Sequence, residues 1–186
     1  MIEDRILNSA INSKHNWDEG LIDELLSIHN ITKDCFKILF PCGLESLADK
    51  FFGRIDQEMI AIISEEFHKL PIYLQVSQLL ESRLNYMSLN KEIILKILSI
   101  KSRFTYQVCH ILKVSDLIWQ NIKHNSSGLD YYTRRMILAN VYKNCLIHFK
   151  KNVSGDEMIL YAKDQLKTVG EFTKLKTKLC KKFSLQ

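Results

Sequence analysis

The sequence predicts an all-α protein of about ten helices. Only 6 glycines and 2 prolines occur among 186 residues, so tight turns are scarce and long helices account for the chain better than strands do. Apolar residues also recur at helical spacing along almost its whole length. Because 46% of the residues are hydrophobic and 25% are charged, the chain has material for a buried core, and disordered and fibrous classes are excluded.

Three short helices are expected at the start of the chain. Asp18 and Thr32 are residues that cap helix N-termini well, and Pro41 stops a helix. These signals predict helices over 3–13, 20–30 and 32–40. Two short helices around a tight turn have the layout of a helix-turn-helix, which we assign to a unit of residues 1–45.

The charge of this unit argues against DNA. Residues 18–45 contain Lys33 and Lys37 against six acidic side chains, a net charge of −4. DNA binding needs cations that displace phosphate counterions. We therefore expect the three helices to serve packing, and no DNA partner.

The remaining helices are predicted to form a ligand-binding and dimerisation domain over residues 46–170. A long helix begins near Leu44, and Pro71 begins the next at a favoured first position. The stripe of the long helix consists of Leu47, Phe51, Ile55, Met59 and Ile62. Further helices are expected over 90–101, 103–123, 130–150 and 155–169, with one clear loop at 125–128.

The helix over 130–150 carries apolar residues on two faces, so we expect it to be central. One face could line a cavity for an apolar ligand while the other meets a second subunit, but plain core packing explains a single face equally well. The candidate ligand-lining residues, taken from this helix and from apolar walls elsewhere, are Leu98, Leu112, Trp119, Met136, Ala139 and Tyr142.

Catalysis and metal binding are poorly supported. Glu65-x-x-His68 and Cys145-x-x-His148 have ligand-like spacing but lack partner motifs. The five cysteines include no C-x-x-C pair, and no phosphate-binding loop or nucleophile elbow occurs. We expect no metal, no cofactor and no enzymatic activity.

A basic amphipathic helix is predicted at residues 171–183, in a C-terminal segment of residues 171–186. An apolar stripe with lysines on its flanks is typical of a helix that lies in the interface of an anionic membrane. The alternative is a helix docked on its own domain. The stripe consists of Phe172, Leu175, Leu179 and Phe183, and the lysines are Lys174, Lys178, Lys181 and Lys182.

Four segments together resemble a known family. They are Leu39-Phe40-Pro41-Cys42-Gly43, Asp116-Leu117-Ile118-Trp119, Asp130-Tyr131-Tyr132-Thr133-Arg134-Arg135 and Glu171-Phe172-Thr173-Lys174-Leu175-Lys176. In order and spacing they resemble the accessory lipid-binding family of ubiquinone (coenzyme Q) biosynthesis, the ninth of its numbered factors. The resemblance implies the fold of TetR-type regulators, with a helix-turn-helix triplet before a helical ligand-binding domain.

The resemblance also implies a function. The protein would be a non-catalytic accessory that binds an isoprenoid or quinone lipid at the membrane and presents it to the di-iron demethoxyubiquinone hydroxylase, so that the di-iron centre belongs to the partner. The docking patch would consist of Tyr131, Tyr132, Arg134 and Arg135; Tyr131 stands where the family has Trp.

Three further expectations follow. The TetR-type fold implies a homodimer that pairs through the last two domain helices. With no signal peptide or apolar span in the sequence, we expect a bacterial cytoplasmic protein peripheral on the inner membrane, or the matrix side of the mitochondrial inner membrane for a mature eukaryotic form. The alternative function is a ligand-responsive TetR-type transcription regulator, which the scarcity of basic residues in the third helix disfavours.

Overall fold

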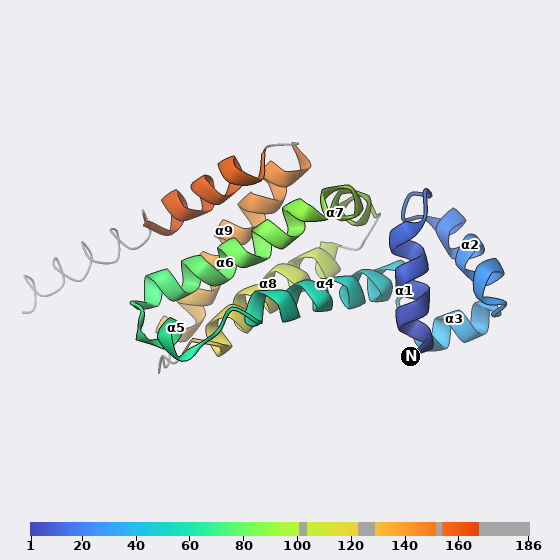
Figure 1. Ribbon diagram of the computed structural model, residues 1–186, viewed down its shortest axis with the longest axis horizontal. Coiled ribbons are helices and arrows are strands. Elements are labelled where there is room, and N and C mark those ends of the chain that lie inside the picture. Colours follow the sequence, from blue (N-terminus) through green and yellow to red (C-terminus); the bar gives the residue numbers. More distant parts are fainter. Residues whose placement is uncertain (101–103, 123–128, 152–153, 168–186) are drawn as a thin grey trace, which may run out of the picture.

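The predicted fold class is confirmed. The computed structural model describes residues 1–100, 104–122, 129–151 and 154–167, and every regular element within these ranges is a helix. Residues 155–167 form the last of them (Figure 1). The labelled helices are α1 (Ile2–Asn12), α2 (Glu19–His29), α3 (Lys33–Leu39), α4 (Leu44–Ile60), α5 (Glu65–Lys69), α6 (Ile72–Leu89), α7 (Lys91–Leu98), α8 (Phe104–Gln120) and α9 (Leu129–Lys150).

The three N-terminal helices lie together at one end of the molecule (Figure 1). Both predicted caps are present: the Asp18 side chain accepts a hydrogen bond from the Gly20 amide at 3.0 Å, and Thr32 accepts one from the Cys35 amide at 3.2 Å. Each cap satisfies an amide that the helix itself leaves free. The helix boundaries therefore fall within a residue or two of those predicted.

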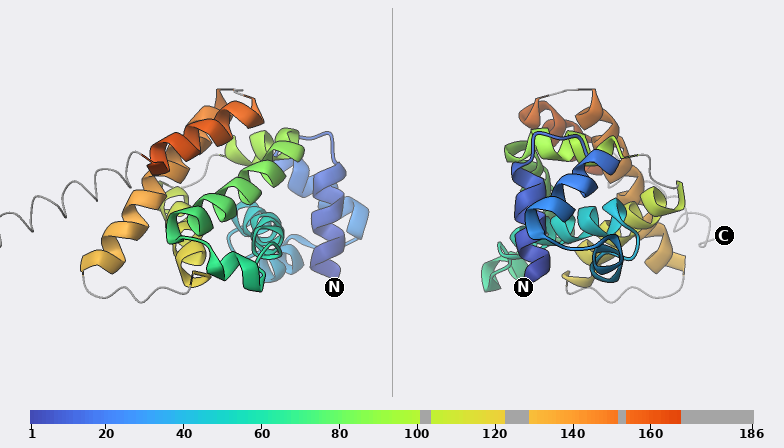
Figure 2. Two further views of the ribbon diagram at one scale, coloured as in Figure 1. Left: turned by 60° about the vertical axis from the view of Figure 1, so that its left-hand side comes forward. Right: turned by 90° about the vertical axis from the view of Figure 1, so that its right-hand side faces the viewer.

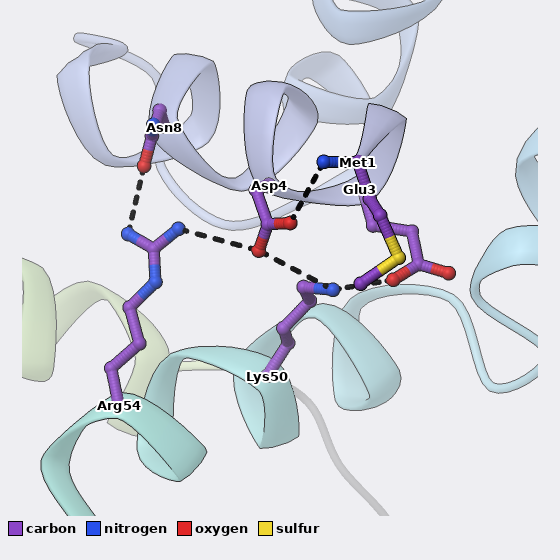
Figure 3. Close-up of polar contacts among 6 residues, drawn as sticks. All are labelled: Met1, Glu3, Asp4, Asn8, Lys50 and Arg54. Carbon is purple, nitrogen blue, oxygen red and sulfur yellow. Dashed lines mark hydrogen bonds and ion pairs between the residues drawn. The ribbon is translucent and has the colours of Figure 1, made fainter. Parts of the chain in front are cut away.

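Polar contacts fasten α1 to the start of α4 (Figure 3). Lys50 of α4 forms ion pairs with Glu3 and Asp4, and Arg54 donates a hydrogen bond to Asn8 at 2.7 Å and lies 3.8 Å from Asp4. Glu3 and Asp4 also occupy the first turn of α1, where negative side chains interact favourably with the helix dipole and stabilise the helix. The long helix α4 is thus shared between the N-terminal triplet and the rest of the protein.

The body of the protein is built from two packed helix pairs. α4 packs along α6, and α8 packs along α9. The predicted α4 stripe is buried at Leu47, Phe51, Ile55 and Met59, but Ile62 is exposed because the helix ends at Ile60. Sequence reasoning also missed the short helix α5, which Ser64 caps by accepting a hydrogen bond from the Phe67 amide.

The last described helix, residues 155–167, lies along α6 (Figure 2). Lys163 forms an ion pair with Glu81 at 2.9 Å. Near its other end, a Cβ added to Gly155 would lie 2.8 Å from the Ser88 Oγ, so this close approach requires glycine. None of the helices in the described ranges has the length and hydropathy needed to span a membrane.

A buried ion pair joins three of these helices in the core. Arg83 of α6 is fully buried; its guanidinium pairs with Asp56 of α4, and its Nε donates to the Tyr142 hydroxyl of α9 at 3.1 Å. The guanidinium carbon lies 5.9 Å from the centre of the Phe52 ring and 5.3 Å from that of Tyr142. These contacts fix the positions of α4, α6 and α9 relative to one another.

We expect the two members of this pair to respond differently to replacement. Asp56→Ala leaves a buried cation without its counter-charge and should lower the free energy of unfolding by about 3 kcal/mol. Arg83→Met should lower it by less than half as much, because Asp56 remains partly exposed and can be hydrated. Urea denaturation of both variants measures the difference; equal losses would contradict this account.

Candidate functional site

A cavity of about 140 Å³ lies among α4, α7, α8 and α9. Cavities of about 150 Å³ hold a benzene molecule, so this one has room for a single ring. Its apolar lining consists of Phe52, Ile97, Leu98, Ile111, Leu146 and Ile147. Its polar lining consists of Tyr106, Gln107, His110, Lys143 and Lys150.

A second hollow, of about 630 Å³, is a wide groove on the surface between α4 and α6. Glutamates and polar side chains of these helices, including Glu58, Glu81 and Gln78, line much of it. An open, acidic groove does not remove an apolar ligand from water. The smaller cavity is therefore the better candidate for such a ligand.

His110 is the unusual residue of the cavity. Its side chain is only 8% exposed, its ring lies 4.2 Å from the Phe52 ring, and its Nε2 has no hydrogen-bond partner among the described residues. Burial, and then the positive charge of Arg83, lower its pKa to about 3. The imidazole is therefore neutral at physiological pH, with a buried polar atom available for a ligand.

This histidine makes the stability of the protein sensitive to acid. Because its pKa is about 3 in the folded protein and about 6.5 in the unfolded chain, only the unfolded chain takes up its proton between these values. The free energy of unfolding should fall by about 1.4 kcal/mol for each pH unit across that window. His110→Phe should abolish this part of the acid sensitivity.

Denaturation of wild type and His110→Phe at pH 7, 6, 5 and 4 measures the effect as a difference, which cancels the titration of other groups. At pH 7 the variant should be at least as stable as wild type, since it removes an unsatisfied buried atom. Parallel pH profiles for the two proteins would show that His110 is protonated normally in the folded state.

The structure separates the predicted ligand-lining residues. Leu98 lines the cavity. Ala139 and Tyr142 are buried in the core, where the Tyr142 hydroxyl contacts Arg83 and the Met87 sulfur. Leu112 and Met136 lie on the surface, 38% and 60% exposed. The six residues therefore do not line one cavity, and lipid binding by any of them stays a prediction.

The sixth predicted ligand-lining residue, Trp119, lies with the predicted docking residues where α8 meets the start of α9. Arg134 lies over the Trp119 ring at 5.5 Å and pairs with Asp130 at 2.8 Å. Arg135 pairs with Asp116 at 2.6 Å and lies 3.4 Å from the centre of the Tyr131 ring.

Tyr132 is the most exposed aromatic residue of this region, at 67%, and its ring meets the edge of Tyr131 at 5.1 Å. We call this group the docking cluster; it consists of Asp116, Trp119, Tyr131, Tyr132, Arg134 and Arg135. The arginines are held in place by carboxylates, so the exposed face offers a rigid aromatic surface.

The predicted membrane-binding residues lie outside the described residues. They are Phe172, Leu175, Leu179, Phe183, Lys174, Lys178, Lys181 and Lys182. Within the described ranges, no group of three or more His, Cys, Asp or Glu side chains lies close enough to hold a metal ion. Burial raises the pKa of the Cys145 thiol to about 12, which suits a core position.

The docking cluster and most of the cavity wall fall in one stretch of sequence, and that stretch has known relatives. Residues 105–159 match the family model described as COQ9. The predicted family resemblance is confirmed. The match covers Asp116–Trp119 and Asp130–Arg135, two of the four segments on which the prediction was based. No curated protein matches the chain significantly.

The COQ9 match supports an accessory role in ubiquinone biosynthesis. It covers all of α9 and nearly all of α8.

Sequence reasoning missed Arg83, His110, Lys143 and Lys150. A signal for His110 was present: it precedes Val114 and Ile118 by four and eight residues, on the face of α8 that both bury. Arg83 likewise lies at helical spacing from the buried Leu79, Leu80 and Met87. A charged or titratable residue on an apolar helix face is the pattern that marks such positions.

Proposed function

We propose that this protein is an accessory factor of ubiquinone biosynthesis that binds an isoprenoid quinone lipid and presents its ring to the di-iron demethoxyubiquinone hydroxylase. The observation that carries the proposal is that the COQ9 match coincides with the helix pair that bears both the cavity and the docking cluster. In the proposed complex, the ring of the lipid occupies the cavity and the docking cluster contacts the hydroxylase.

The isoprenoid chain has to lie elsewhere, because a cavity of about 140 Å³ has room for one ring. Phe104, Val108 and Leu112 form an exposed apolar stripe on α8, at spacings of four residues. The stripe adjoins Ile111, which lines the cavity. A chain that leaves the cavity beside Ile111 would cover this stripe, so Leu112 keeps a place in the proposed lipid site.

We further propose that residues 171–186 bind anionic membrane through the stripe and lysines named above, which would place the protein on the membrane surface where its lipid resides. Exposed apolar residues on α9 and the helix after it, Met136 and Leu160 among them, support pairing of two copies. Homodimer formation, binding to the membrane surface and location at the inner membrane are thus parts of the proposal.

Mass spectrometry of lipids extracted from the purified full chain, produced in bacteria that make quinones, tests the proposal. We expect an isoprenoid lipid with a quinone or phenol ring. Ile147→Trp should lower its yield severalfold, because Ile147 lines the cavity, is 44% exposed and can be enlarged without crowding the core.

Ile38→Trp, at an exposed isoleucine of α3 that does not line the cavity, is the matched control and should retain the lipid. Recovery of phospholipid alone, or equal quinone-lipid yields from Ile147→Trp and wild type, would contradict the proposed lipid site.

A second experiment tests the docking cluster. Tyr132→Ala should weaken binding to the hydroxylase by about 2 kcal/mol, because exposed aromatic anchors dominate such interfaces. The melting temperature should stay within 2 °C or so of wild type, since surface substitutions change stability little. Tyr73→Ala, at an equally exposed tyrosine of α6, is the control. Unchanged affinity in Tyr132→Ala would place the docking surface elsewhere.

No contact in the described residues favours the alternative of a DNA-binding regulator. Lys33, one of the two cations of α3, lies 3.4 Å from Asp23, so its charge is already balanced. The absence of a DNA partner stays a prediction, which a mobility-shift assay with random duplexes tests.

A further inference from the structure

The charged side chains that line the cavity are lysines. Lys143 and Lys150 lie two turns apart on α9; both are exposed and both line the cavity, so they mark its solvent side. Neither forms an ion pair with a carboxylate in the described part of the chain. The cavity lining includes no Asp or Glu. Two unbalanced cations therefore stand at the entrance of an apolar cavity.

Two carboxylates of α4, the helix that contributes Phe52 to the cavity, are already engaged. Asp56 pairs with the buried Arg83. Asp49 accepts a hydrogen bond from the Tyr106 hydroxyl at 3.0 Å and lies 3.7 Å from Lys113. Asp49 and Asp56 therefore do not balance the charges of Lys143 and Lys150.

His110 offers the cavity a buried hydrogen-bonding atom. His110 Nε2 is buried and unpartnered among the described residues. A hydroxyl group satisfies it whichever imidazole nitrogen carries the proton, because a hydroxyl both donates and accepts. A neutral carbonyl satisfies it only when Nε2 is protonated.

We propose that the cavity selects a single aromatic ring that carries an acidic group, a carboxylate or an acidic phenol, over its neutral counterpart. The ring lies among the apolar residues, the anionic group lies toward Lys143 and Lys150, and a ring hydroxyl bonds His110 Nε2. This inference rests on the proposed function, since it names the head-group chemistry of the same cavity. The acidic ring would be a further ligand of this cavity beside the quinone lipid, whose isoprenoid chain also contributes to its binding.

Binding of matched small molecules to the full chain, followed by calorimetry or ligand-detected NMR, tests the inference. Benzoate and benzamide share size and shape but differ in charge. Benzoate should bind about tenfold more tightly, as two partly exposed ion pairs would give. Hydroxybenzoates should bind more tightly than benzoate through His110.

Two sets of variants separate the contributions. Lys143→Gln with Lys150→Gln should bring benzoate down to the affinity of benzamide. Lys37→Gln with Lys69→Gln removes the same charge from exposed sites outside the cavity and should preserve the preference. His110→Phe should abolish the advantage of the hydroxyl and leave the preference for benzoate over benzamide.

The ring can reach the cavity as a free acid or as the head of a lipid. A hydroxybenzoate with a short isoprenoid chain, compared with the unsubstituted acid, distinguishes the two sources: tighter binding of the substituted compound identifies the lipid, and tighter binding of the plain acid identifies the free ring. Either result supports the acidic head group when benzoate exceeds benzamide.

Equal binding of benzoate and benzamide, a preference that survives the Lys143 and Lys150 changes, or no binding of any ring would overturn the inference. These failures are distinguishable from failure of the proposed function. If benzoate and benzamide bind equally while the extracted protein carries a quinone lipid, the proposed function stands and the acidic selectivity is wrong.

Discussion

The packing of α4, α6 and α9 depends on the buried guanidinium of Arg83. Arg83 is fully buried, and among the described residues the Asp56 carboxylate, the Tyr142 hydroxyl and the rings of Phe52 and Tyr142 compensate for its lost hydration. These partners come from α4 and α9, so the three helices have to meet in one register for the charge to be tolerated. Phe52, one turn before Asp56, is thereby held against His110 and becomes a wall of the cavity. The position of the cavity is thus a consequence of the ion pair.

The same packing leaves polar atoms unsatisfied, which is costly in a buried site. His110 Nε2 and one Nη of Arg83 both lack partners in the described residues. A purely structural core would be more stable with apolar residues at such positions, as the comparison of buried ion pairs with apolar replacements suggests in other proteins. In the proposed function, a ligand that completes the hydrogen bond of His110 Nε2 offsets this cost.

The sequence allowed correct prediction of those features that depend on neighbouring residues, above all the ends of the helices. Asp18, Thr32 and Pro41 marked helix ends because caps and prolines act on neighbouring residues, and α5 was missed because five residues are too few to show a period. Helical spacing also tells which residues share a face, but not which helix covers that face. For this reason Met136 and Leu112 were assigned to a cavity and lie on the surface, while Arg83 found its partner Tyr142, 59 residues away, only in the folded chain.

One helix pair brings the cavity and the docking cluster close together. Ser115 donates a hydrogen bond to the Arg135 carbonyl at 2.6 Å, and Arg135 pairs with Asp116, so α8 and α9 are joined between the two sites. His110 and Asp116 are six residues apart on α8, which is about 9 Å along a helix. In the proposed complex, a ring released from the cavity would therefore have a short distance to travel to a hydroxylase bound at Tyr132 and Trp119. Because both sites are parts of one rigid pair, a substitution that shifts α9 against α8 will disturb ligand binding and docking together.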